Sequence, residues 1–258
     1  MHWILALDTH AALYLNALAQ QSRVLTRLAI FLLDSDFLKG GVITAIIVWL
    51  WFKSDARQTA TRLQIVMLCA GAAIAVVFSR LAQQALPFRL RPIHDPALNL
   101  IPPYGLNPET LAHWSSFPSD NAVLYGALAT GLFLISRAGG LLGWAWTLGV
   151  ILTPRLFLGL HFLSDVYAGL AFGALIMTIA FRLKSCLGRS IGLLLQIEKS
   201  RPGFYYAIGL LFIWQIDTAF PECRAGLRMA LELFQTTAIA SDGTAHPWEA
   251  SYERADNP

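Results

Sequence analysis

The run from Thr153 to Asp165, TPRLFLGLHFLSD, places three residues able to do chemistry inside an apolar stretch. Inserting a charge among membrane-grade residues costs roughly 2.5–3.5 kcal/mol, so such charges usually mark function. His161 and Asp165 are four residues apart, so on a helix they would share a face and could hydrogen-bond. A carboxylate on one imidazole nitrogen fixes the tautomer and leaves the other nitrogen free to attack. Arg155 could fold back through a turn as a planar clamp for an oxyanion or a phosphate.

A second polar cluster, QALPFRLRP, covers residues 84–92 at the end of an apolar segment. Arg89 and Arg91 stand at this predicted membrane edge, where an arginine can hold a phosphate with two parallel hydrogen bonds. The alternative for Arg91 is a simple anchor to lipid headgroups. Gln84, at the start of the cluster, is interpreted either as a ligand or as a residue with a structural role only.

The third cluster, FPSDN, covers residues 117–121 and opens another apolar segment. Ser119 is a favourable N-cap, and a helix N-terminus offers free N–H groups and a positive dipole end to an anion. Asp120 and Asn121 follow in the first turn, where Asn121 could also be an ordinary polar residue. Together the three clusters supply a nucleophile, an orienting group and a phosphate cradle. They contain no cluster of metal ligands, so we expect neither a metal nor another cofactor.

The composition indicates a membrane protein. Of the 258 residues, 56% are hydrophobic and 14% are charged, whereas soluble domains carry about 25% charged residues. The net charge of +3 is too small to indicate a nucleic-acid partner. The three cysteines are scattered and predict neither a disulfide framework nor a zinc site.

Hydropathy predicts an all-α, polytopic transmembrane helical bundle. Residues 1–37 form an amphipathic segment with an interfacial helix near 3–19, residues 38–221 form the membrane domain, and residues 222–258 form a polar tail. The proline-rich segment 87–118 cannot be one continuous helix and should be an ordered cap or loop. About six spans are expected, at roughly 38–52, 63–86, 119–136, 141–160, 162–182 and 203–221.

Basic residues in the short loops predict the orientation in the membrane. Alternate loops carry Lys53, Arg57 and Arg62, then Arg137, then Arg182, Lys184, Arg189, Lys199 and Arg201. These loops should face the cytoplasm. The three polar clusters then all fall on the opposite face, and this convergence is stronger evidence for a site than any one motif.

In this order the clusters resemble the signature motifs of the type 2 phosphatidic acid phosphatase superfamily of membrane lipid phosphatases, which read K-x6-R-P, P-S-G-H and S-R-x5-H-x3-D. The resemblance covers about residues 63–182. Its third motif is specific: Arg155, His161 and Asp165 match it, and Pro154 takes the place of its serine. The amphipathic N-terminus is similar to that of bacterial members that act on undecaprenyl diphosphate.

The resemblance implies a role for each matching residue. In the family the third-motif histidine attacks phosphorus and becomes a phosphohistidine, and this role falls on His161, with Asp165 orienting it. Arg91, Arg155 and the backbone near Ser119 would bind the phosphoryl oxygens.

Two motifs depart from the family pattern. Gln84 stands where the first motif has lysine, and Arg89 is a candidate for the missing charge. In the second motif Asp120 replaces the glycine. Asn121 replaces the histidine that protonates the leaving group, and an asparagine cannot donate that proton.

The loss of this acid indicates a substrate class. Cleavage of a phosphomonoester expels an alkoxide, which needs a proton. Cleavage of a lipid diphosphate expels a phosphate monoester, whose second pKa is about 6. General acid catalysis contributes about 10²–10⁴-fold, so a site without its acid should favour a phosphoanhydride. The alternative is that His94 or His113, both in the proline-rich segment, supplies the proton.

We therefore expect a multi-pass enzyme of the bacterial inner membrane whose site faces the periplasm or the cell exterior. Its partners would be the bilayer and a lipid phosphate, with an undecaprenyl-type polyprenyl diphosphate as substrate and water or another acceptor. One alternative is a phosphatase for phosphatidic acid or phosphatidylglycerophosphate. Another is a catalytically weakened lipid-phosphate-binding protein. A transporter is less well supported, since no pair of spans shows the repeated broken-helix pattern.

Overall fold

The computed structural model describes residues 2–183, 192 and 194–217, and the regular elements in these ranges are all helices, with no strand. The predicted all-α class is thus confirmed. The elements are α1 (His2–Gln21), α2 (Arg23–Asp34), η1 (Phe37–Gly41), α3 (Val42–Phe52), α4 (Gln58–Ala85), η2 (Pro92–His94), α5 (Asp120–Ile135), α6 (Arg137–Trp146), η3 (Thr147–Leu152), α7 (Thr153–Phe157), α8 (Leu163–Arg182) and α10 (Pro202–Asp217).

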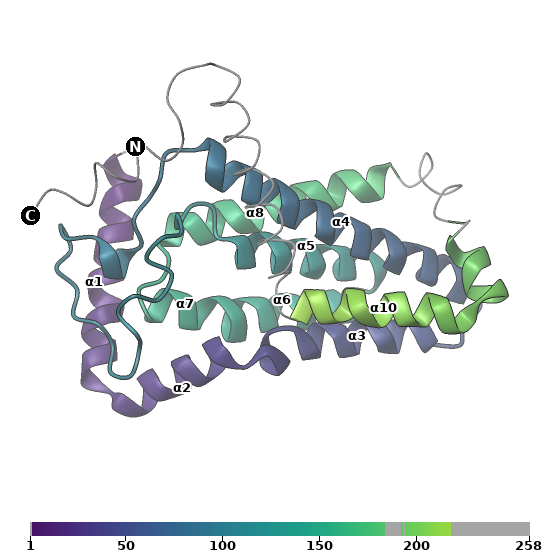
Figure 1. The fold of residues 1–258 in the computed structure, drawn as a ribbon, viewed down its shortest axis with the longest axis horizontal. Coiled ribbons are helices and arrows are strands. Elements are labelled where there is room, and N and C mark those ends of the chain that lie inside the picture. The colour runs from purple at the N-terminus through teal and green to yellow at the C-terminus, as the bar shows by residue number, and fades with distance from the viewer. Residues whose placement is uncertain (1, 184–191, 193, 218–258) are drawn as a thin grey trace, which may run out of the picture. The chain divides into compact units, whose positions relative to one another are not determined.

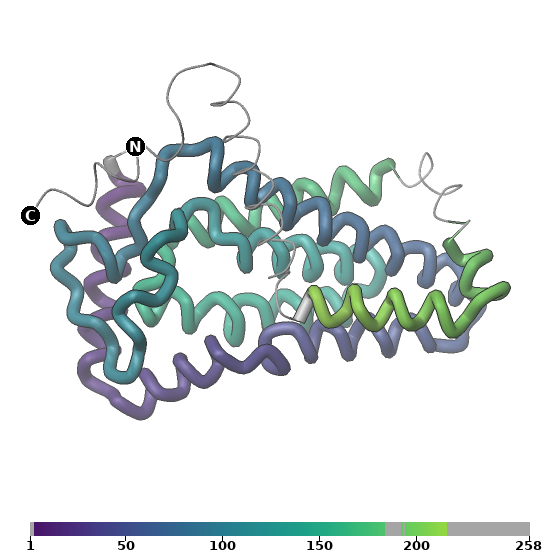
Figure 2. Tube along the Cα trace, in the orientation of Figure 1, coloured from purple at the N-terminus to yellow at the C-terminus, as the bar shows by residue number. Residues whose placement is uncertain are grey.

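The centre of the bundle is the pair α5 and α8, with α4 and α6 packed against α5 (Figures 1 and 2). Small residues permit the close approach. A side chain at Gly173 would overlap the carbonyl oxygen of Val123, and a Cβ at Gly126 would lie 3.1 Å from the Cα of Leu170. Since this contact holds the beginnings of α5 and α8 together, the polar clusters before each helix become neighbours.

Within the described part of the chain, three helical segments are long and apolar enough to cross a membrane, namely Gln58–Ala85, Arg137–Phe157 and Leu163–Arg182. Two more expected spans correspond to shorter apolar helices, Phe37–Phe52 and Asp120–Ile135. The sixth expected span falls on α10, and its last residues lie outside the described part of the chain. The short α5 is buried on almost every side from Ala122 to Leu132, so it lies among other helices rather than against lipid.

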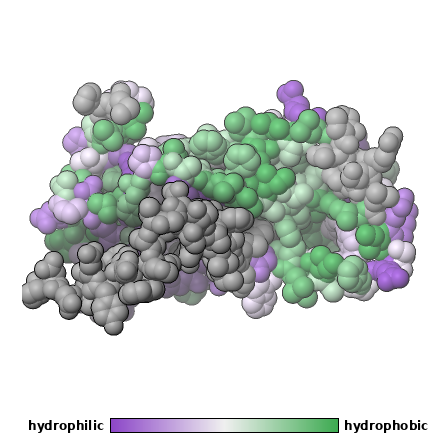
Figure 3. Space-filling view, turned by 45° about the horizontal axis from the view of Figure 1, so that its top comes forward, coloured by the Kyte–Doolittle hydropathy of each residue, from purple (hydrophilic) through white to green (hydrophobic). Residues whose placement is uncertain are grey.

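Outward-facing side chains of the long helices are strongly apolar. On α4 the exposed residues include Ile74, Val77, Phe78 and Leu81. Figure 3 shows hydrophobic side chains gathered along the helices of the face that it presents. This surface fits a hydrocarbon solvent rather than water.

Residues 137–157 form one continuous helix that changes from α-helical to π-helical hydrogen bonding near its centre and back again. The wider π turn η3 ends two residues before Pro154, which lacks an N–H and whose ring would clash with a carbonyl four residues back in a regular helix. Arg155 lies in the last short helix α7, and the chain then turns at Gly159 with φ +70°. This turn places His161 just before the first residue of α8.

The N-terminal region forms two helices, in agreement with the prediction of a helix near 3–19. Helix α1 contacts α7 and α8, and Figure 1 shows it running across the end of the bundle where those two helices meet. Segment 87–118 contains only the short helix η2 and is otherwise irregular, as its prolines predict. The expected polar tail, 222–258, lies outside the described residues.

The orientation of the bundle can be tested at Asn107, an exposed residue of this irregular segment. We expect a single cysteine placed there to react with a membrane-impermeant thiol reagent in intact cells, because the basic loops predict that the motif face lies outside the cytoplasm. A cysteine at Asp55, in a basic loop at the other ends of the helices, is the matched control and should react only after lysis. The reverse pattern would overturn the proposed compartment.

Candidate active site

His161 is buried in the turn between α7 and α8 and does not lie on a helix. The expectation that it shares a helical face with Asp165 is therefore wrong, because α8 begins only at Leu163. Its Nδ1 lies 3.0 Å from the carbonyl oxygen of Ser116 and 3.8 Å from Oδ2 of Asp165. Because a carbonyl oxygen only accepts, the short contact indicates that Nδ1 carries the proton and that Nε2 carries the lone pair.

Asp165 is fully buried and organises the beginning of α8. Its Oδ2 accepts a hydrogen bond from the backbone N–H of Phe162 at 2.8 Å, which satisfies a donor that the helix leaves free. Its Oδ1 accepts from Nη1 of Arg89 at 2.5 Å. Asp165 thus presents a paired negative charge near His161 and does not bond the ring as closely as Ser116 does.

Arg91 is buried beside the other nitrogen of the imidazole. Its Nη1 lies 3.2 Å from Nε2 of His161 and donates to the carbonyl of Leu160 at 2.7 Å. It also donates to the carbonyls of Leu111 and Ser115. Burial lowers the pKa of Arg91 to about 10, so the side chain remains a cation at neutral pH.

Burial also lowers the pKa of His161 below its usual 6.5, with the positive charge of Arg91 acting in the same direction and Asp165 opposing both. The imidazole is therefore neutral at pH 7. A neutral imidazole with its free nitrogen beside a guanidinium is a competent nucleophile for an anionic group that the guanidinium can bind.

The beginning of α5 joins the site through side chains. Ser119 caps the helix by accepting a hydrogen bond from the backbone N–H of Ala122, as predicted. Asn121 accepts from Nη2 of Arg155 at 3.1 Å, so the second and third clusters are in direct contact. Arg155 also donates to the carbonyl of Ile151, one turn earlier in its own helical segment.

Asp120 faces a partner that sequence reasoning missed. It forms a buried ion pair with Arg80 of α4, whose guanidinium also lies over the ring of Trp114, 4.8 Å from the centroid. Arg80 was recognisable as a charge inside an apolar helix. Gln84, the position of the family lysine, is exposed one turn further along, and the structure does not bring it to His161.

Arg89, the candidate replacement for that lysine, is already held by carboxylates. It pairs with Asp165 and, through Nη2 at 2.8 Å, with Asp8 of α1. Its Nη1 also donates to Oγ of Ser164 at 2.8 Å. Asp8 was likewise missed, because nothing local distinguishes an acid in the first turns of an N-terminal helix.

The two histidines considered as alternative acids lie elsewhere in the proline-rich segment. Nε2 of His94 lies 2.8 Å from the carbonyl of Pro108, and His113 is exposed. Neither makes a contact with His161 among the described hydrogen bonds. Within the described ranges, no group of three or more His, Cys, Asp or Glu side chains is arranged to hold a metal ion.

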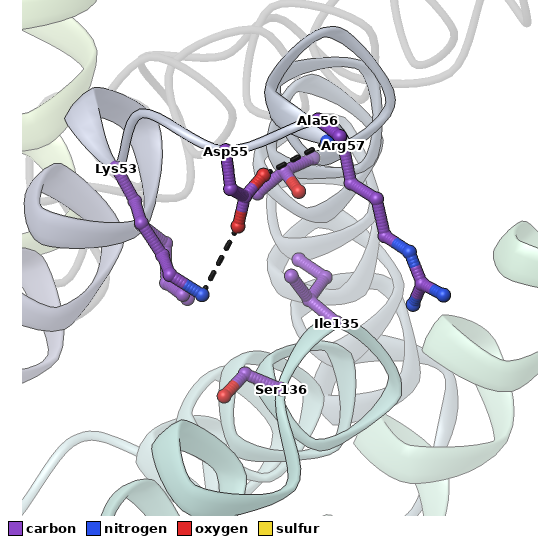
Figure 4. A pocket seen from close by; sticks show the side chains of 8 residues that line it. Lys53, Asp55, Ala56, Arg57, Ile135 and Ser136 are labelled. Carbon is purple, nitrogen blue, oxygen red and sulfur yellow. Dashed lines mark hydrogen bonds and ion pairs between the residues drawn. The ribbon is translucent and has the colours of Figure 1, made fainter.

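A surface cavity of about 420 Å³ lies away from this site. Lys53, Asp55, Arg57 and Ser136 are among its lining residues, and Figure 4 shows Asp55 between the amine of Lys53 and the backbone of Arg57. Since Ser136 follows the last residue of α5 and Ser119 precedes the first, the cavity and the candidate site lie at opposite ends of that helix.

Comparison with known proteins supports the identification of the motifs. Residues 88–188 match the family model described as the PAP2 superfamily, a range that includes Arg91, Ser119, Arg155, His161 and Asp165. The predicted relationship to the type 2 phosphatidic acid phosphatase superfamily is thus confirmed over the segment that forms the site. The helical fold and the match over this segment support a helical membrane protein of the lipid phosphatase type. No curated protein and no solved structure matched the chain.

Proposed function

We propose that this protein cleaves a terminal phosphate from a membrane lipid through a covalent intermediate on Nε2 of His161. The observation that carries the proposal is the arrangement of the imidazole, with its Nδ1 3.0 Å from the Ser116 carbonyl and its Nε2 3.2 Å from the Arg91 guanidinium. The first contact holds the proton away from the attacking atom. The second places a cation where the oxygens of a phosphoryl group would lie.

In the first step the lone pair of Nε2 attacks phosphorus, and the bond from phosphorus to the leaving oxygen breaks. Arg91, Arg155 and the beginning of α5 at Ser119 would stabilise the charge on the phosphoryl oxygens. The phosphate competes with neutral carbonyls for Arg91, and a charged acceptor is the stronger partner. Water or another acceptor then attacks phosphorus and releases Nε2.

The preferred substrate class in this proposal is a polyprenyl diphosphate of the undecaprenyl type. Asn121 occupies the position of the family's proton donor and is held by Arg155. With no acid at this position, departure of a phosphate monoester is much easier than departure of an alkoxide. For this substrate the protein would lie in the bacterial inner membrane, with its active site on the extracytoplasmic face.

A phosphate-release panel in detergent tests the substrate. It compares polyprenyl diphosphate, polyprenyl monophosphate, phosphatidic acid and phosphatidylglycerophosphate, and we expect the diphosphate to give the largest kcat/KM. A preference for phosphatidic acid or phosphatidylglycerophosphate would favour the second candidate substrate class. Binding of all four lipids without release would instead favour a lipid-phosphate-binding protein, an alternative motivated by Gln84 and Asn121.

Activity should persist in the presence of a chelator and should be inhibited by vanadate. The positive charge at this site comes from guanidinium groups and a helix N-terminus, and vanadate would mimic the five-coordinate phosphorus at Nε2 of His161. The measurement is phosphate release from metal-free substrate with EDTA and with a vanadate series. A divalent-metal requirement that survives removal of metal bound to the lipid would refute this part of the proposal.

A further inference from the structure

Asp8 is a buried acid in the first half of α1, far from the motifs in sequence. Its Oδ1 accepts from the backbone N–H of Ser164 at 2.9 Å, and its Oδ2 accepts from the hydroxyl of Ser164 at 2.5 Å. Oδ2 also accepts from Nη2 of Arg89 at 2.8 Å. Two of the three donors to Asp8 belong to Ser164 at the beginning of α8, and the third belongs to Arg89 in the segment after α4, so this buried carboxylate is fully hydrogen-bonded.

Arg89 is the link between Asp8 and the reaction centre. One guanidinium nitrogen bonds Asp8, the other bonds Asp165, and the guanidinium carbon lies 4.2 Å from the ring centroid of Phe162. Two carboxylates therefore share one cation, and the group carries a net charge of about −1 next to His161. If Asp8 were neutral, Arg89 and Asp165 would balance each other, and the three side chains would carry no net charge.

This balance matters when Nε2 of His161 bonds to phosphorus. The ring keeps its proton on Nδ1, so it acquires positive charge as the new bond forms. We propose that Asp8 is a positioning residue of the active site, which shares Arg89 with Asp165 and thereby keeps the surroundings of His161 negative enough to stabilise that charge. The inference rests on the proposed role of His161 and adds α1 to the functional part of the molecule.

Other charged groups act on the imidazole as well, and all of them must stay constant in a test. Asp120 and Asp165 raise the pKa of His161, and Arg91 lowers it. The charged groups around the site come from α1, α4, the segment after α4, α5, α7 and α8: Asp8, Arg80, Arg89, Arg91, Asp120, Arg155 and Asp165. Only the charge on Asp8 is altered by the variant below.

The test is the pH dependence of kcat/KM in Asp8→Asn. A nearby negative charge favours the protonated imidazole, so its removal should lower the pKa of His161. The acidic limb, where rate is lost as His161 gains a proton, should move to lower pH by about 0.5 unit, less than the 1–3 units of a directly adjacent charge. The plateau rate should fall about 10-fold, as for other residues that act through a group in direct contact with the reacting centre.

Two variants separate charge from structure. Ser164→Ala removes the hydroxyl contact of Asp8 and leaves every charge in place, so its acidic limb should coincide with that of the wild type. Asp8→Glu keeps the charge and should restore the limb even where the rate stays low. Asp8→Ser offers a second neutral side chain if the asparagine variant is poorly folded.

An unshifted acidic limb in the neutral variants would contradict the inference, even if their rates fell, because a purely structural contact would do the same. A wild type that releases no phosphate from any lipid would instead contradict the proposed function. The inference is then decided without turnover, by ¹⁵N NMR titration of the His161 ring in detergent. The pKa should be lower in Asp8→Asn than in the wild type, and equal values would overturn the role of Asp8.

Discussion

Replacing His161 by alanine should lower phosphate release by at least about 10⁴-fold, the scale on which the loss of a nucleophile acts in enzymes with covalent intermediates. The residue is buried, yet its ring makes polar contacts on both nitrogens, so the variant loses chemistry more than packing. The measurement is release from the best lipid of the panel, with folding checked by thermal unfolding in detergent.

The matched control is His113→Ala, which changes an exposed histidine of the neighbouring segment and should retain the wild-type rate. Asp165→Asn should be slow as well, because it removes one of the two buried carboxylates that Arg89 holds and with it the negative charge beside His161. Its loss of rate should be smaller than that of His161→Ala, since the Ser116 carbonyl still fixes the proton on Nδ1. A wild-type rate in His161→Ala would show that His161 is not the nucleophile.

Asn121→His should raise monoester hydrolysis by up to about 10²-fold, at the low end of general acid effects, and should change diphosphate hydrolysis much less. The physical reason is the basicity of the leaving group: an alkoxide needs the proton that a histidine can donate, whereas a phosphate monoester hardly does. The new side chain would begin next to Arg155, which now bonds Asn121 at 3.1 Å.

Rates for this variant are best compared between about pH 5 and pH 8, where a histidine titrates. The carboxylate of Asp120 would favour the protonated ring and Arg155 would oppose it, so the pH optimum reports which neighbour dominates. Asn121→Gln is the control, because it keeps an amide and supplies no acid. Equal gains on both substrates, or a wild type that already prefers monoesters, would show that the missing acid does not set the substrate class.

The parts of this site that were predictable from sequence are those with local signals. Ser119 caps α5 because a hydroxyl before an apolar helix satisfies a free N–H. The approach of Arg155 to Asn121 agrees with the prediction, made from the basic loops, that both clusters lie on the same face of the bundle. A charged residue in apolar sequence usually marks a functional position, and a capping residue marks the start of a helix, so both can be identified from the sequence alone.

The parts that were not predictable depend on partners distant in sequence or on local turns. Asp8 lies 81 residues from Arg89, and no periodicity links the two. The geometry between His161 and Asp165 was mispredicted because the turn at Gly159, with φ +70°, holds the histidine outside α8. A spacing of four residues indicates a shared face only when both residues lie in the same helix.

The most direct test of the central claim is to trap the covalent intermediate. Purified protein is mixed with polyprenyl diphosphate labelled with ³²P in the terminal phosphate, quenched rapidly in alkali, and digested for mass spectrometry. We expect a label that is stable in alkali, is lost in acid, resides on the peptide containing His161, and is missing in His161→Ala. Rapid turnover without any labelled protein, or a label on another residue, would contradict it.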